Sequence, residues 1–198
     1  MSARGVSLII PAWNEERRLP SALDQYIPLL EGSKLPFEFI VVADGVTDKT
    51  VEVAANYSGR GVRVLHFETK LGKGGAIIEG FKNARYELVG FLDADAPITA
   101  QDLALMLSIL STADAAIASR WLSGSDGELN QPISRILLSR TWNLLVRGVL
   151  GLSVYDSQCG AKFFRREAVL KVLPQVTLTN WAFDVSLLFH LTHAGMKL

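Results

Sequence analysis

Short apolar runs of strand type alternate with longer helical patterns along the first 120 residues of the chain. Runs rich in β-branched and aromatic residues predict strands at residues 6–10, 37–42, 62–67, 88–92 and 115–119. Helical periodicity predicts helices at residues 15–30, 47–57 and 75–84, and a further one after Thr99, which has Asp102 three residues on as in a capping box. This alternation is typical of an α/β domain with a mostly parallel central sheet flanked by helices. We expect a single domain over residues 1–198.

Polar side chains follow the ends of the first four expected strands. They are Asn14 and Glu15, then Asp44, then Lys70 and Lys73, and finally Asp93 and Asp95. In open parallel sheets, ligands bind outside the carboxyl ends of the strands. The sequence therefore predicts one ligand site at this edge of the sheet.

Asp93 and Asp95 come directly after the apolar run 88–92. Mg²⁺ and Mn²⁺ accept one or two carboxylates and take their other ligands from phosphate oxygens and water. A nucleotide diphosphate would supply those oxygens, so the pair is a candidate metal site. The alternative is that either aspartate caps the turn that follows, as aspartate often does.

The charge balance and the single cysteine exclude several classes of protein. Twenty basic and twenty acidic residues cancel, so no overall field attracts nucleic acid, and we expect no nucleic-acid partner. Cys159 is the only cysteine, which excludes an internal disulfide framework and suits a reducing compartment. No run reaches the roughly 18 apolar residues of a membrane-spanning helix.

Several motifs, taken in order, resemble those of family 2 glycosyltransferases. They are residues 10–16 (IPAWNEE), 39–50 (FIVVADGVTDKT), 70–76 (KLGKGGA), 93–95 (DAD) and 118–120 (ASR). Residues 156–166 (DSQCGAKFFRR) and 181–184 (WAFD) are similar to the branch that glucosylates or mannosylates dolichyl phosphate. The resemblance implies a GT-A fold. It also implies an inverting transfer of a hexose from a nucleotide diphosphate sugar, UDP-glucose first and GDP-mannose next, to a polyprenyl or dolichyl phosphate.

The resemblance also assigns the donor-binding residues. It implies that Pro11, Trp13 and Glu15 line the nucleoside pocket, that Asp44 contacts the base, and that Lys73 and Asp93 lie beside the nucleotide. An aromatic ring can stack on a base, and plain core packing is the alternative for Trp13. For Glu15 the alternative is a favourable charge at a helix N-terminus.

The glycine-rich run at residues 72–75 leaves two interpretations open. It lacks the residues of a Walker motif and follows the third strand, so it is no dinucleotide fingerprint. It is either a simple turn before a helix or a loop that lets the backbone approach a ligand.

Residues 133–150 predict an amphipathic helix with a basic side, which is typical of helices at a membrane interface. An ordinary surface helix is the alternative. The resemblance implies that Arg120, Arg135 and Ser139 hold the phosphate of the lipid acceptor. We therefore expect a membrane surface as a partner, with the protein peripherally associated on the cytoplasmic side.

In the expected mechanism, Asp95, with Asp93 in support, holds Mg²⁺ or Mn²⁺ and so stabilises the departing nucleotide. A phosphomonoester has a second pKa of about 6, so the acceptor needs positioning more than deprotonation. Asp156 and Asp184 are the remaining catalytic candidates, with capping or a salt bridge as the alternative.

Three departures from the family pattern leave other functions open. Ala43 stands where an aspartate is usual, Val46 where a serine is usual, and Pro97 near a position that often carries a polar ligand. A nucleotidyltransferase and a non-catalytic nucleotide-sugar-binding domain are the alternatives. Because related chains continue beyond the end at residue 198, we also expect a C-terminal truncation.

Overall fold

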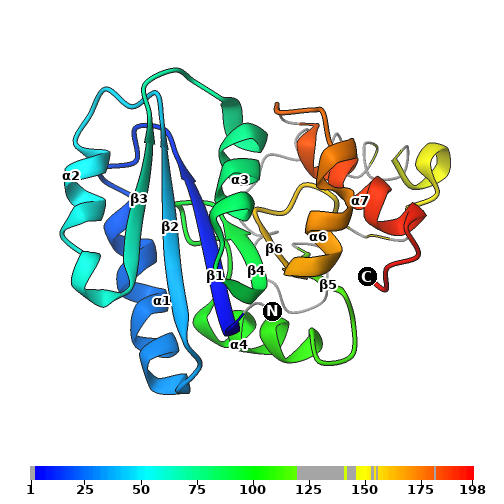
Figure 1. The fold of residues 1–198 in the computed structure, drawn as a ribbon, viewed down its shortest axis with the longest axis horizontal. Coiled ribbons are helices and arrows are strands. Elements are labelled where there is room, and N and C mark those ends of the chain that lie inside the picture. Colours follow the sequence, from blue (N-terminus) through cyan, green and yellow to red (C-terminus); the bar gives the residue numbers. More distant parts are fainter. Residues whose placement is uncertain (1–2, 120–140, 142–145, 153, 155, 181) are drawn as a thin grey trace.

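The computed structural model describes residues 3–119, 141, 146–152, 154, 156–180 and 182–198. These residues form a six-stranded sheet in the order β3-β2-β1-β4-β6-β5, covered by helices on both faces (Figure 1). The strands are β1 (Ala3–Ala12), β2 (Phe37–Asp44), β3 (Val62–Phe67), β4 (Tyr86–Leu92), β5 (Ala115–Ile117) and β6 (Ala161–Arg165). The α-helices are α1 (Leu19–Ser33), α2 (Thr50–Ala55), α3 (Gly72–Asn83), α4 (Ala100–Ile109), α6 (Arg166–Val172) and α7 (Phe183–His193). Short 3₁₀ helices lie at η1 (Ser58–Arg60) and η3 (Leu173–Gln175).

The parallel part of the sheet agrees with the sequence-based prediction. β1 pairs in parallel with β2 and with β4, and β2 pairs in parallel with β3. The carboxyl ends of β1, β2 and β4 therefore meet at one edge of the sheet. This confirms a mostly parallel sheet flanked by helices.

β6 is a strand that the sequence pattern did not predict. It pairs antiparallel with β4 on one side and with β5 on the other, so the sheet is mixed. The second residue of β6 is Lys162 and the last is Arg165, so the sequence lacks the continuous apolar run that is typical of a buried strand. β5 is also shorter than predicted and ends at Ile117.

Two loops explain why α1 and α2 begin later than predicted. Asn14 adopts a left-handed conformation with φ of 58°, and its Oδ1 accepts a hydrogen bond from the backbone N–H of Thr47 at 2.8 Å. The backbone N–H of Glu15 donates to Oγ1 of Thr50 at 2.8 Å. These bonds hold the loops after β1 and β2 together. By contrast, the capping box of Thr99 and Asp102 at α4 is confirmed.

Two apolar cores lie on the two faces of the sheet. Adjacent strand residues point to opposite faces, so Leu8 packs in the core under α1 and α4, and Ile9 packs in the core under α3, α6 and α7. In the second core, the ring of Phe91 lies edge-to-face with that of Phe183, with 6.3 Å between centroids. Because Phe91 is the penultimate residue of β4, this packing fixes the strand end that carries Asp93 and Asp95.

Candidate functional site

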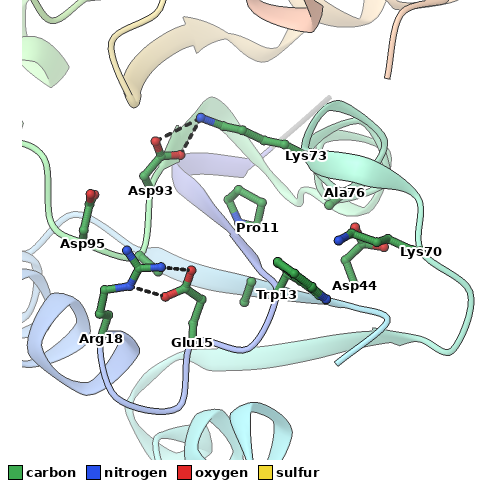
Figure 2. Close-up of a pocket in the computed structure, with 12 residues that line it drawn as sticks. Pro11, Trp13, Glu15, Arg18, Asp44, Lys70, Lys73, Ala76, Asp93 and Asp95 are labelled. Carbon is green, nitrogen blue, oxygen red and sulfur yellow. Dashed lines mark hydrogen bonds and ion pairs between the residues drawn. The ribbon is translucent and has the colours of Figure 1, made fainter. Parts of the chain in front are cut away.

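A cleft of about 350 Å³ opens at the carboxyl ends of β1, β2 and β4 (Figure 2). Its walls come from the strand ends, from the loops that follow them and from the first turns of α3. The described residues that line it are Pro11, Ala12, Trp13, Glu15, Arg18, Asp44, Lys70, Lys73, Ala76, Asp93, Ala94 and Asp95. The structure thus brings together every residue predicted to bind the donor, together with both predicted metal ligands.

Trp13 presents its ring at the mouth of this cleft. The residue is 54% exposed, which excludes core packing as the reason for an indole at this position. The ammonium Nζ of Lys70 lies 3.3 Å from the centroid of the ring, as expected for a cation–π contact. An exposed indole with a cation beside it can stack on a flat, electron-rich ligand such as a nucleobase.

Asp44 connects the end of β2 to the start of α3. The residue is 3% exposed, and its carboxylate accepts hydrogen bonds from the backbone N–H groups of Leu71 and Gly72, the second at 2.9 Å. It therefore supplies acceptors for N–H groups that the start of a helix leaves free. Asp44 also lines the cleft, so the same side chain supports the predicted nucleoside pocket.

Residues 72–75 are neither a turn nor a loop, because they form the first turn of α3, and their approach to a ligand stays a prediction. The reason for this start of the helix is close packing. A Cβ at Gly74 would overlap the side chain of Phe183, and the backbone N–H of Gly74 donates to the carbonyl of Thr179 at 2.9 Å. Glycine thus allows the first turn of α3 to press against the start of α7.

Lys73 and Asp93 form an ion pair inside the cleft. Nζ of Lys73 lies 2.7 Å from one carboxylate oxygen of Asp93 and 2.9 Å from the other (Figure 2). Burial acts to lower the pKa of Lys73, but the carboxylates of Asp93, Asp184 and Asp95 outweigh it and raise that pKa above its usual value. Lys73 is therefore a fixed positive charge at physiological pH, suited to a phosphate ligand.

Arg18 is a cleft residue that the sequence did not single out. Its guanidinium group donates to both carboxylate oxygens of Glu15, at 2.6 and 2.7 Å. The hydrogen bond and charge of Glu15 raise the pKa of Arg18, and Asp95 and Asp93 add to this effect. Lys70 and Lys73 thus share the cleft with a third cation.

The carboxylates at the end of β4 fit a hard divalent cation. Both line the cleft, and within the described part of the chain no group donates a hydrogen bond to Asp95, whereas Asp93 is paired with Lys73. No cluster of three or more His, Cys, Asp or Glu side chains is arranged for metal binding among the described residues. A cation at Asp95 would therefore take most of its oxygens from a ligand and water, which is how Mg²⁺ is commonly bound.

The other two catalytic candidates are not among the residues that line this cleft. Asp184 is 4% exposed in the first turn of α7, and its Oδ1 lies 2.6 Å from Nζ of Lys162. Asp156 is 1% exposed and accepts a hydrogen bond from the N–H of Gln158 at 3.3 Å. Neither lines the cleft within the described part of the chain, so their catalytic roles stay predictions.

The predicted acceptor site falls largely outside the described residues. Arg120, Arg135 and Ser139 lie in the ranges that the structure does not describe, as does most of the predicted amphipathic helix at 133–150. Among the described residues, none of the helices combines the length and the apolar character that crossing a membrane requires.

Residues 7–173 match the family model described as glycosyl transferase family 2. The dolichyl-phosphate beta-glucosyltransferase of Drosophila melanogaster is 36% identical over 200 residues, covering 93% of this chain and 61% of the relative. The enzyme of that name from Homo sapiens is 32% identical, with 93% and 62% covered. This chain therefore spans about three fifths of the length of these relatives.

Solved structures confirm the GT-A fold expected from the resemblance. Glucosyl-3-phosphoglycerate synthase from Mycobacterium tuberculosis, in complex with Mn²⁺, UDP-glucose and phosphoglyceric acid, matches with a TM-score of 0.64 and 25% identity. The match covers 93% of this chain and 64% of that one. The same synthase in complex with UDP matches with a TM-score of 0.67 and 22% identity. The family model and the sequence relatives show that the chain belongs to glycosyl transferase family 2, and its fold agrees with that membership.

Proposed function

We propose that this protein transfers glucose from UDP-glucose to a dolichyl or other polyprenyl phosphate. One observation carries the proposal: an exposed indole, a fixed ammonium group and a carboxylate with no ion-pair partner among the described residues share one cleft at the strand ends. These three groups match three features of a nucleotide sugar bound together with a metal: the base, the diphosphate and the cation. The names of the sequence relatives support glucose and dolichyl phosphate as the transferred sugar and the acceptor.

In this proposal Trp13 and Asp44 receive the nucleoside. The exposed ring of Trp13 offers a stacking surface, and Asp44 holds the start of α3 beside it. Lys73, in the first turn of α3, then meets the diphosphate, where a helix N-terminus adds a favourable field for an anion. Pro11 and Glu15 complete the wall of the nucleoside pocket.

We assign Mg²⁺ or Mn²⁺ to Asp95, with Asp93 in support. The cation would neutralise negative charge on the departing nucleotide, as a Lewis acid does. Lys73 pairs with Asp93 and places a second positive charge at the same part of the cleft. The protein thereby makes the nucleoside diphosphate a better leaving group without a strong general base.

The acceptor phosphate is already largely dianionic near neutral pH, because its second pKa is about 6. It therefore attacks the anomeric carbon once it is positioned, and the configuration inverts. We assign its binding to Arg120, Arg135 and Ser139, on the resemblance of the sequence motifs. The lipid acceptor would place the protein at a membrane surface, and we propose the cytoplasmic side.

A transfer assay tests the proposal. The chain is incubated with Mn²⁺, dolichyl phosphate in detergent micelles and radiolabelled UDP-glucose or GDP-mannose, and the label extracted with the lipid is counted. We expect metal-dependent labelling from UDP-glucose, which Asp95→Asn abolishes. Preferred labelling from GDP-mannose would overturn the choice of donor.

Two other outcomes would replace the proposal. Release of inorganic diphosphate from a nucleoside triphosphate would indicate a nucleotidyltransferase. Tight binding of UDP-glucose with neither transfer nor hydrolysis would indicate a binding domain, the function that Ala43 in place of the usual aspartate would favour.

A further inference from the structure

Lys162, in β6, carries a fully buried ammonium group. Its residue is 0% exposed, and its Nζ lies 2.6 Å from Oδ1 of Asp184 and 2.6 Å from the carbonyl oxygen of Cys159. Removing a charged group from water is costly unless it is paired and hydrogen-bonded. Because a lysine in the core costs free energy that an apolar side chain would not, we expect Lys162 to have a role in the neighbouring cleft.

Asp184 connects this buried lysine to the cleft. It lies in the first turn of α7, against which the first turn of α3 is packed through the contact of Gly74 with Phe183. Lys73 directly precedes Gly74, and Asp184 directly follows Phe183. The start of α7, which Asp184 anchors to Lys162, therefore packs against the turn of α3 that carries Lys73.

One ion pair lies on each side of this packing contact. Lys162 pairs with Asp184 in the core, and Lys73 pairs with Asp93 in the cleft. Phe91 forms an apolar frame for both lysines, with its ring centroid 5.2 Å from Nζ of Lys162 and 5.9 Å from Nζ of Lys73. The Lys162–Asp184 pair is buried, so the interaction between its charges is stronger than in water.

We propose that Lys162 and Asp184 are positioning residues whose buried pair holds the Lys73 ammonium group in place for the diphosphate of the donor. This inference rests on the proposed function, in which Lys73 meets that diphosphate. Lys162 and Asp184 neutralise each other inside the core and so fix the start of α7, on which the turn that carries Lys73 packs. Asp184 thereby acts through Lys73.

The inference can be tested by comparing two ligands that differ only in the diphosphate. The affinities of UDP and of uridine are measured calorimetrically, with Mn²⁺ present, for the wild type, Lys73→Met and the double variant Lys162→Met/Asp184→Asn. The double variant removes both buried charges together, which avoids the unpaired carboxylate that Lys162→Met alone would leave in the core. Lys82→Met, at an exposed lysine on the same helix α3, is the control.

We expect the double variant to bind UDP about tenfold more weakly, the size of effect typical of a lost hydrogen bond to a charged group. Uridine binding should stay unchanged, because the base and ribose do not meet Lys73. Adding Lys73→Met to the double variant should cause less further loss than it causes in the wild type, since the three residues act together.

Wild-type affinity for UDP in the double variant would overturn the inference, and so would an equal loss of UDP and uridine affinity. Full additivity of the Lys73→Met effect would overturn it as well. The proposed function fails separately, if the wild-type chain itself binds no UDP.

Discussion

The ammonium group of Lys73 lies within 2.9 Å of both carboxylate oxygens of Asp93. This pair divides the two aspartates at the end of β4 between two tasks. Asp93 orients a lysine, whereas the carboxylate of Asp95 faces the cleft without such a partner in the described part of the chain. We therefore place the metal chiefly on Asp95.

Gly160 leaves the space that Asp93 occupies. A Cβ at position 160 would overlap Oδ2 of Asp93, and the backbone N–H of Asp93 donates to the carbonyl of Gly160 at 2.9 Å. We predict that Gly160→Ala displaces the Asp93 carboxylate and lowers transferase activity at least about tenfold, as misplaced catalytic groups commonly do.

The stability of that variant should change little, because the end of a side chain moves more easily than backbone. Urea unfolding and the transfer assay measure the two effects. Gly59→Ala, where an added Cβ meets nothing within 4 Å, is the control. Full activity in Gly160→Ala would show that the position of Asp93 does not matter.

Asp44 offers a test of the connection between β2 and α3. Asp44 now accepts hydrogen bonds from two backbone N–H groups. In Asp44→Asn, one of these N–H groups would face an NH₂ group instead of an oxygen. We predict a loss of about 1–3 kcal/mol in the free energy of unfolding, the cost of a buried unsatisfied donor. Chemical denaturation measures it. Glu87→Gln, at an exposed position of β4, should leave the stability unchanged, and equal stability of both variants would contradict the capping role.

Trp13 should contribute to binding of the base and not of the diphosphate. Stacking of a base on an aromatic side chain is worth about 1–3 kcal/mol, so Trp13→Ala should weaken UDP and uridine by a similar factor of about ten. Titration with both ligands checks this, and Leu105→Ala, at an exposed leucine on α4, serves as the control. A loss confined to UDP would mean that the indole contacts the phosphates.

The burial of Tyr26 lets us predict how the folding stability falls at alkaline pH. Its hydroxyl group is buried and donates to the carbonyl of Ile98 at 2.7 Å. Burial raises the pKa of Tyr26 from 10.0 to about 12. The unfolded chain therefore loses this proton first, so the stabilisation is complete below pH 10 and is lost as the pH rises towards 12.

The loss assigned to Tyr26 amounts to about 1 kcal/mol at pH 11. Urea unfolding at pH 8 and pH 11 measures it, with Tyr26→Phe as the comparison. The variant keeps the carbonyl of Ile98 satisfied, because Nε2 of Gln25 also donates to it at 2.8 Å. Wild type and Tyr26→Phe should differ in their pH dependence by this amount, and an identical dependence would contradict the assignment.

The sequence predicted the parallel part of the sheet and the residues of the cleft for one physical reason. Strand-like runs followed by polar residues indicate a parallel sheet, whose carboxyl ends meet at one edge. Trp13, Asp44, Lys73 and Asp95 are far apart in the chain, and the structure places them in one cleft.

What the sequence could not predict depends on contacts between distant segments. The start of α3 at Gly72 was missed because glycine disfavours a helix locally, and the approach of Phe183 and the hydrogen bonds to Asp44 explain it. β6 was missed because Lys162 interrupts its apolar pattern, and the partner that makes this lysine tolerable, Asp184, comes 22 residues later. Arg18 carried no motif signal, since its place in the cleft follows from the loop before α1.

The central claim is that Asp95 holds a divalent cation that the nucleotide needs. Calorimetric titration of UDP into the wild type and into Asp95→Asn, each with Mn²⁺ and with chelator, tests it most directly. The account predicts that Mn²⁺ strengthens UDP binding to the wild type at least about tenfold, the scale of a charge-assisted contact, and that Asp95→Asn loses this increase while keeping the metal-independent affinity. Equal affinity with and without Mn²⁺ in the wild type, or an undiminished Mn²⁺ effect in Asp95→Asn, would contradict it.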